Sequence, residues 1–121
     1  QLTGKQIREA LEHGVAGIAD ESGAFPQVSG LSFTFKADEP KGKKVGKITV
    51  GGRPLIESKS YIVATTDFMA VGGDGYEAFK AAGKKAQLAG ASRMLRDVVV
   101  DYVKSLGVVS PKVEGRIKPL K

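Results

Sequence analysis

Apolar residues near the start of the chain recur at the spacing of an α-helix. The apolar positions three or four residues apart are Ile7, Leu11, Val15 and Ile18. Thr3 can cap this helix and Gln6 can return the hydrogen bond, because a hydroxyl followed three residues later by an amide forms a capping box. Leu2 can pack onto Ile7 from outside the helix. The pattern therefore predicts an amphipathic helix that begins just after Thr3.

The middle of the chain alternates between apolar and polar residues, a pattern typical of half-buried strands. The expected strands are residues 31–36, 45–50 and 61–64. In the first of them Phe33 and Phe35 share one face, so we expect both rings in the core. Gly51 and Gly52 follow the second strand and predict a hairpin turn, because glycine takes the positive φ that two-residue hairpin loops need.

Helical spacing returns in the C-terminal half. Residues 76–82 predict a short helix, and the stretch 81–91, rich in Gly, Ala and Lys, predicts a loop. A last helix is expected to end at Gly107. The residues of its apolar face are Leu95, Val98, Val99, Tyr102 and Leu106. We expect that face, Tyr102 included, to pack in the core. The tail, residues 108–121, carries no predicted helix or strand.

Together these elements predict one α+β domain spanning residues 1–121, with a mixed or antiparallel sheet flanked by helices. The chain has 121 residues, enough for one domain, and 41% of them are hydrophobic, enough to form a core. It has no cysteine and one histidine, which excludes disulfides, thiolate metal sites and multi-histidine metal sites within this chain. No apolar run reaches the ~20 residues that a membrane-spanning helix needs.

The net charge of +6 arises from 19 Lys and Arg residues against 13 Asp and Glu residues. A positive surface is compatible with anionic ligands or polymers. The basic residues are spread along the chain, however, and no aromatic residues interleave with them as they do in a nucleic-acid reader. We therefore expect a solvated basic surface.

A glycine-rich stretch follows the third expected strand. Gly72, Gly73 and Gly75 bracket Asp74, and they predict a sharp turn that projects the carboxylate. Phe68 lies six positions earlier on the same excursion. An aromatic face beside a fixed carboxylate suits a ligand with a ring and hydroxyls, such as a nucleoside. The alternative is an ordinary strand-to-helix turn in which Asp74 caps the helix and Phe68 packs in the core.

Two further residues fall outside the periodic patterns. Phe25 belongs to no helical or alternating pattern, and Pro26 restricts its backbone to extended geometry. Its ring is either an exposed platform or a plug over the core, and both interpretations stay open. His13 lies on the first helix with no second ligand or nucleophile nearby, so we interpret it as a surface or partly packed histidine.

Several catalytic signatures do not fit the sequence. The stretch from Gly72 to Gly75 resembles the signature of cyclic-dinucleotide synthases, but that signature needs an acidic residue where Gly75 stands. No glycine-rich phosphate loop followed by Lys-Ser or Lys-Thr is present. A Ser/His/Asp triad built on His13 has no support in the spacing. By residue inventory, this chain alone is not expected to be a catalyst.

Four motifs in chain order resemble the C-terminal domain of 5'-nucleotidases, over nearly the whole chain. They are Leu2-Thr3-Gly4 leading into Glu9-Ala10-Leu11-Glu12-His13, then Phe25-Pro26-Gln27-Val28-Ser29-Gly30, then Ala64-Thr65-Thr66-Asp67-Phe68 with Gly72-Gly73-Asp74-Gly75-Tyr76, and finally Glu114-Gly115-Arg116-Ile117. The resemblance implies that Phe25 and Phe68 clamp a nucleotide base between their rings. It also implies that Asp74 accepts hydrogen bonds from ribose hydroxyls, within a substrate-binding motif that includes Gly72 and Gly73.

The same resemblance implies a larger enzyme, related to bacterial UDP-sugar hydrolases and cyclic-nucleotide phosphodiesterases. In such enzymes an N-terminal metallophosphatase domain holds two metal ions and the catalytic His–Asp pair. The C-terminal domain binds base and ribose, and rotates to deliver the phosphate to the metals. The metallophosphatase domain is absent from this chain, so we expect no cofactor here and divalent metal ions in that domain. An extracellular, cell-surface or periplasmic location is implied as well.

One departure from the family pattern concerns the start of the domain. The family domain usually begins well before the position of Gln1, with a segment whose arginines and asparagine contact the substrate. We therefore expect a domain truncated at its N-terminus, with part of the pocket missing. A sheet that lacks neighbouring strands exposes pairing edges, which makes self-association an expectation.

A function of another class competes with nucleotide recognition. The chain could be a structural or adhesion domain that kept the fold without the ligand, and its basic face would then bind anionic polymers. The sequence leaves open which nucleotide is preferred. It also leaves open whether the longer enzyme cleaves monophosphates, cyclic phosphates or UDP-sugars.

Overall fold

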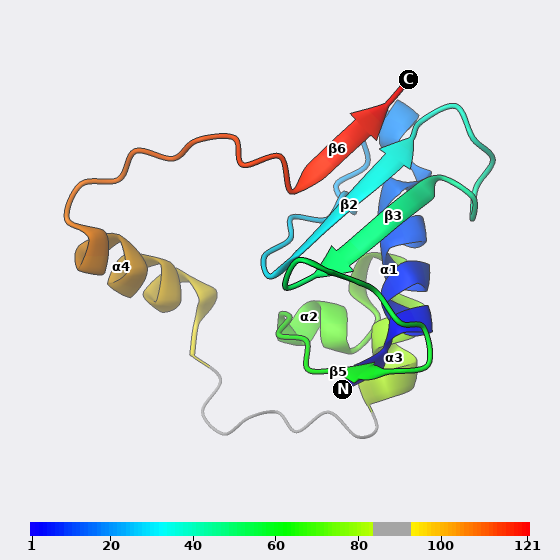
Figure 1. Cartoon of the computed structure of the whole chain (residues 1–121). Helices are drawn as coiled ribbons and strands as arrows, with labels where there is room; N and C mark the ends of the chain where they lie inside the picture. The colour runs from blue at the N-terminus through cyan, green and yellow to red at the C-terminus, as the bar shows by residue number, and fades with distance from the viewer. Residues whose placement is uncertain (84–92) are drawn as a thin grey trace.

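The computed structural model describes residues 1–83 and 93–121 of the chain (Figure 1). The helices are α1 (Gly4–Ala16), α2 (Asp67–Ala70), α3 (Glu77–Gly83) and α4 (Leu95–Leu106), with single 3₁₀ turns η1 (Ile18–Asp20) and η2 (Gly73–Gly75). The strands are β1 (Leu2–Thr3), β2 (Leu31–Lys36), β3 (Val45–Val50), β4 (Arg53–Pro54), β5 (Ser60–Tyr61) and β6 (Ile117–Leu120).

The main sheet has the strand order β4-β3-β2-β6. β2 pairs antiparallel with β3 and parallel with β6, so the sheet is mixed. A second, two-stranded sheet joins β1 to β5. In Figure 1, α1 lies behind the main sheet, and α2 and α3 gather at the end of the molecule near β5. The predicted α+β domain with a mixed sheet and flanking helices is confirmed.

The first helix and the strand that it covers form as predicted. Thr3 and Gln6 make the capping box, with the Thr3 backbone N–H donating to the Gln6 side chain at 2.8 Å. The apolar face of α1 packs on the sheet and buries Phe33 and Phe35. The buried members of this core are Leu2, Ile7, Leu11, Val15, Phe33, Phe35, Val45 and Ile48. Hydrophobic burial of this set holds α1 against the sheet.

Polar side chains on α1 fix its position along β3. The two carboxylate oxygens of Glu12 accept hydrogen bonds from the backbone N–H groups of Lys44 and Val45, each at 2.9 Å. The guanidinium of Arg8 donates to the carbonyls of Val45 and Gly46, both at 3.2 Å. Because these groups lie at the start of β3, α1 and the sheet are joined by hydrogen bonds as well as by apolar contact.

The hairpin prediction is confirmed and one strand prediction is wrong. Gly51 and Gly52 take φ of 55° and 77° and connect β3 to β4. The strand expected over residues 61–64 ends at Tyr61, and Ile62 points outward with 89% of its surface exposed. The pairing partner of β5 is β1, which has two residues, so the ladder cannot extend further. The apolar run predicted four strand residues, but the neighbouring strand β1 pairs with only one of them, Tyr61.

The C-terminal strand β6 was not predicted from the sequence. It contains Pro119, and its apolar and polar residues show no clear alternation. It forms by pairing with β2. The backbone N–H of Phe33 donates to the carbonyl of Arg116 at 2.8 Å, and Phe33 pairs with Ile117 in register. Pro119 is tolerated because β6 is an edge strand, where one missing N–H need not break a ladder. This strand therefore depends on pairing with a segment that is distant in the sequence.

The last helix forms as predicted, but its predicted burial is wrong. α4 ends at Gly107, which takes a positive φ of 70°. Its apolar face is exposed in the part of the chain that the structure describes, and Tyr102 leaves 63% of its surface open. Figure 1 shows α4 standing away from the sheet and from α1. Helical spacing establishes which residues share a face, and it does not establish what that face packs against.

Two other expectations concern regions beyond the core. The loop expected over residues 81–91 overlaps the end of α3, and from residue 84 it lies outside the described residues. Self-association stays a prediction. Within residues 1–83 and 93–121, no helix is long and apolar enough to cross a membrane.

Candidate functional site

The ring of Phe68 is presented to solvent on a short helix. Thr66 caps α2 by accepting a hydrogen bond from the Met69 N–H at 3.3 Å, and Phe68 follows in its first turn. The Phe68 ring leaves 55% of its residue surface exposed, so the alternative that placed it in the core is wrong. A Cβ atom at Gly73 would lie 2.5 Å from two of its ring carbons. Glycine at position 73 therefore lets the ring lie directly on the backbone of the turn.

The turn beyond Phe68 holds Asp74 in an unusual backbone conformation. Gly72 and Gly75 take positive φ angles of 94° and 79°, which glycine adopts at little cost. Asp74 between them has φ of 52°, in the left-handed region that few non-glycine residues occupy. Its side chain is exposed and makes no hydrogen bond to the described residues, so it does not cap α3. The fold thus places an unpaired carboxylate on a strained turn.

Phe25 lies on a different loop and packs one side of its ring on the core. Its ring meets that of Phe35 edge to face, with centroids 6.0 Å apart. The residue is half-buried and lines a shallow hollow of about 310 Å³ together with Ile18, Glu21 and Ser22. Both interpretations of Phe25 therefore hold in part, because the ring covers the core and also borders open space.

The two loops that carry the aromatic candidates are joined by Tyr76. Its hydroxyl donates a hydrogen bond to the carbonyl of Ala24 at 2.6 Å, one residue before Phe25. The Tyr76 ring is buried, and a Cβ atom at Gly14 would lie 2.6 Å from its hydroxyl oxygen. The glycine on α1 thus makes room for a side chain that connects the Asp74 turn to the Phe25 loop.

His13 supports the same turn from α1. Its Nε2 atom lies 2.6 Å from the carbonyl oxygen of Asp74, and its ring meets the Tyr76 ring edge to face with centroids 4.9 Å apart. The interpretation of His13 as a partly packed histidine is consistent with this place. Its contact with a residue 61 positions away has no signal in the local sequence. The contact of Tyr76 with the Phe25 loop has no signal in the local sequence either. The glycine at position 14, beside His13, is compatible with close packing on this face of α1.

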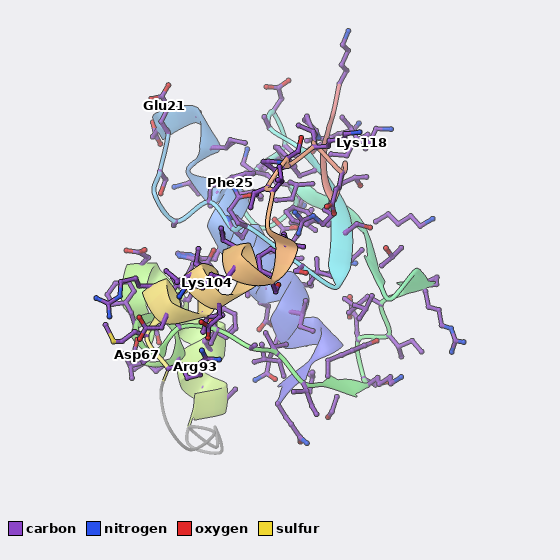
Figure 2. All side chains as sticks on the ribbon, turned by 90° about the vertical axis from the view of Figure 1, so that its left-hand side faces the viewer. Glu21, Phe25, Asp67, Arg93, Lys104 and Lys118 are labelled. Atoms are coloured by element: carbon purple, nitrogen blue, oxygen red, sulfur yellow. The ribbon has the colours of Figure 1, made fainter. Side chains whose placement is uncertain are left out.

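Four of the predicted site residues lie on one segment of the chain, and the fifth, Phe25, lies on another loop. Phe68, Gly72, Gly73 and Asp74 lie together in one excursion. Phe25 is linked to them through Tyr76, and no ring pair between Phe25 and Phe68 is present among the described residues. In the view of Figure 2, α4 lies in front, with Phe25 and Glu21 seen above it and Asp67 seen below it. The base clamp therefore stays a prediction.

The described residues do not supply a metal centre. Among residues 1–83 and 93–121, no three His, Asp or Glu side chains gather into a group that could hold an ion. The divalent metal ions implied for the longer enzyme stay an expectation.

Burial of Tyr76 makes the stability of the domain sensitive to alkaline pH. Burial raises the pKa of the Tyr76 phenol above 10.0, and the negative charge of Asp74 raises it further. Above pH 10 the unfolded state loses this proton more readily than the folded state, so the free energy of unfolding should fall as the pH rises through the folded pKa. Tyr76→Phe should weaken this decline and cost about 1 kcal/mol at neutral pH by removing one hydrogen bond. Urea denaturation from pH 8 to 11 measures both effects, and equal slopes for the two proteins would contradict the assignment.

Comparison with known protein families shows which family this chain belongs to. Residues 1–81 match the family described as 5'-nucleotidase, C-terminal domain. This chain belongs to that family. The match covers α1, the strands β1 to β5, the Phe25 loop and the turn that carries Phe68 and Asp74.

Relatives of this 5'-nucleotidase C-terminal domain are similar over almost all of its length. The chain is 41% identical to the trifunctional nucleotide phosphoesterase protein YfkN of Bacillus subtilis, covering 97% of this chain and 8% of that protein. It is 34% identical to a 5'-nucleotidase of Diplobatis ommata, covering 97% of this chain and 21% of that protein. The crystal structure of a 5'-nucleotidase precursor from Thermus thermophilus superimposes with a TM-score of 0.83 at 37% identity, over 98% of this chain and 24% of that one.

The similarity covers only a small part of each relative. The domain spans a quarter or less of each of these three relatives. Their common part is the region described above, with its α+β fold.

Proposed function

We propose that this domain recognises the base and ribose of a nucleoside or nucleotide on behalf of a 5'-nucleotidase-type phosphoester hydrolase. The observation that carries the proposal is the exposed Phe68 ring seated on Gly73, beside the exposed carboxylate of Asp74. The left-handed backbone at Asp74 costs stability, and strain of this kind is typical of binding and catalytic sites. Family membership supports the same conclusion.

The base would stack on the Phe68 ring. Stacking on an aromatic side chain contributes about 1–3 kcal/mol per base and accepts any base, since each has a π-face. Phe25 would supply the second ring, from a loop that Tyr76 ties to the Asp74 turn through Ala24. A base held from both faces would suit an enzyme that accepts several nucleotides.

The ribose would be held by Asp74. Its carboxylate can accept hydrogen bonds from two neighbouring hydroxyls, and charge-assisted bonds of this kind are stronger than neutral ones. Gly72 and Gly73 have no side chains to obstruct the approach of the sugar. A ligand that lacks one hydroxyl would leave the carboxylate partly unpaired, and this gives ribose discrimination.

The remaining parts of the function belong to the longer enzyme. We propose that a metallophosphatase domain carries the divalent metal ions and the catalytic groups, and that it contacts this domain within one chain. We also propose an extracellular, cell-surface or periplasmic location. The present domain would then contribute binding and orientation, and no bond-breaking step.

Phe68→Ala is the direct test of the stacking role. The variant should bind adenosine about 5- to 150-fold more weakly than the wild type, which corresponds to the loss of about 1–3 kcal/mol of stacking. Isothermal titration calorimetry measures this ratio. Tyr102→Ala is the matched control, because Tyr102 is a similarly exposed ring on α4. Equal adenosine affinities for Phe68→Ala and the wild type would refute the role of the ring.

Asp74→Gly separates binding from stability. Glycine adopts positive φ without strain but has a more flexible unfolded chain, so the free energy of unfolding should change by no more than about 1 kcal/mol. The preference for adenosine over 2'-deoxyadenosine should nevertheless disappear. Urea denaturation and calorimetry on the same protein measure the two quantities. A retained preference would show that another group reads the ribose.

The competing function, a ligand-free domain that binds anionic polymers, makes a different prediction about salt. Binding driven by the basic surface should weaken steeply as the salt concentration rises, because counterions are released. Adenosine binding by stacking and hydrogen bonding should change little. Titration with adenosine and with RNA at two salt concentrations distinguishes the two functions.

A further inference from the structure

We propose that His13 is a positioning residue that sets the direction of the Asp74 carboxylate and so determines ribose discrimination. This inference rests on the proposed function, since Asp74 must first bind ribose. The imidazole donates from Nε2 to the carbonyl oxygen of Asp74 at 2.6 Å. His13 lies within α1, a helix of 13 residues packed on the core, so the donor is rigidly placed.

The turn around Asp74 needs support from outside itself. Its own hydrogen bonds are short-range ones, from Gly75 to Gly72 at 3.1 Å and from Tyr76 to Gly73 at 3.2 Å. In the described part of the chain, the bond from His13 is the hydrogen bond that ties residues 72–75 to α1. With φ of 52° at Asp74, the left-handed backbone determines where the carboxylate points. Loss of the bond should therefore release the carboxylate without unfolding the domain.

The imidazole also fits closely between its neighbours. A Cβ atom at Gly75 would lie 2.8 Å from the Cε1 atom of His13, so glycine is what allows the ring to approach. The Tyr76 ring meets the imidazole at an interplanar angle of 76°. These contacts hold the ring plane so that Nε2 faces the Asp74 carbonyl. A carbonyl oxygen only accepts hydrogen bonds, hence Nε2 must carry the proton.

Two charged residues stand next to this contact in the sequence, Asp74 on the turn and Glu12 on α1. Asp74 presents its carbonyl to His13, while its carboxylate is exposed. Glu12, the neighbour of His13 on α1, is engaged with the backbone of Lys44 and Val45. His13 thus acts on Asp74 by a hydrogen bond to the backbone and not by pairing with the carboxylate.

The test compares three ligands on wild type, His13→Leu and His13→Gln by calorimetry. The wild type should prefer adenosine over 2'-deoxyadenosine by about tenfold, the size of one hydrogen bond to a charged acceptor. His13→Leu should reduce that ratio to about twofold and leave the affinity for 9-methyladenine, which has no ribose, unchanged. His13→Gln retains an N–H donor and should restore part of the ratio. In the Asp74→Asn background, His13→Leu should produce no further change.

Three results would overturn the proposal. One is an unchanged ratio in His13→Leu, and another is an equal loss of affinity for adenosine and 9-methyladenine, which a general structural role would produce. The third comes from the wild type alone, because long-range proton–nitrogen correlation spectra identify the imidazole tautomer. A proton on Nε2 is expected, and a neutral ring protonated on Nδ1 would contradict the bond. If the wild type does not bind adenosine at all, the proposed function itself fails.

Discussion

The Gly4→Ala variant is expected to lose about 3 kcal/mol of its free energy of unfolding, through overpacking and two disturbed hydrogen bonds. A Cβ atom at Gly4 would lie 2.3 Å from the carbonyl oxygen of Ile56 and 2.9 Å from the Cα atom of Glu57. These are backbone atoms, so no side chain can rotate away. The clash would separate α1 from the carbonyls of Glu57 and Lys59, which accept hydrogen bonds from its first N–H groups.

Chemical denaturation in urea measures this loss, and Gly23→Ala is the matched control. A Cβ atom at Gly23 would meet no atom of the described residues within 4 Å. The control should therefore change the free energy of unfolding by less than about 0.5 kcal/mol, as surface substitutions usually do. Equal stabilities for the two variants would contradict the close approach of α1 to the loop before β5.

The second large effect is expected for Glu12→Ala, which should destabilise the domain by about 2–4 kcal/mol. Both oxygens of Glu12 accept backbone hydrogen bonds, from Lys44 and Val45, each at 2.9 Å. Hydrogen bonds to a charged group contribute about 1.5–3 kcal/mol each, and the partial solvent exposure of Glu12 lowers their sum. Alanine would leave two N–H groups at the start of β3 without their acceptor.

Two variants control for this effect in urea denaturation. Glu12→Gln keeps one acceptor oxygen and should lose about half as much stability. Glu9→Ala removes a neighbouring glutamate on α1, whose exposed ion pair with Lys5 is 4.0 Å long, and should cost less than about 0.5 kcal/mol. If Glu9→Ala and Glu12→Ala were equally stable, the anchoring of β3 to α1 by Glu12 would be wrong.

The sequence predicted those parts of the fold that depend on near neighbours. The capping box of Thr3 and Gln6, the burial of Phe33 and Phe35, and the turn at Gly51 all depend on residues a few positions apart. Periodicity and turn chemistry act over that range.

Elements that depend on distant partners were predicted poorly. β6 exists because β2 pairs with it, and β5 stops because β1 is short. The apolar face of α4 has the spacing of a buried helix and yet is exposed among the described residues. A one-dimensional pattern contains no information on which surface will cover such a face.

The part of the candidate site that depends on neighbouring residues could be predicted from the sequence. The glycines around Asp74 indicated a turn that projects the carboxylate, and the exposure of Asp74 and its φ of 52° agree with that. The contacts of His13 and Tyr76 join α1, the turn and the Phe25 loop across 61 and 52 positions of sequence. Since neither residue belongs to a recognisable local pattern, their roles emerge only from the folded chain.

The most direct test of the central proposal is a set of intermolecular nuclear Overhauser effects between bound adenosine and the aromatic side chains. If one base stacks on both rings, the adenine H2 and H8 protons should show cross-peaks to the ring protons of Phe25 and of Phe68. The ribose protons should show cross-peaks to the turn at Asp74. Cross-peaks from adenine to Tyr102 on α4, or to neither phenylalanine, would contradict nucleoside recognition at this site.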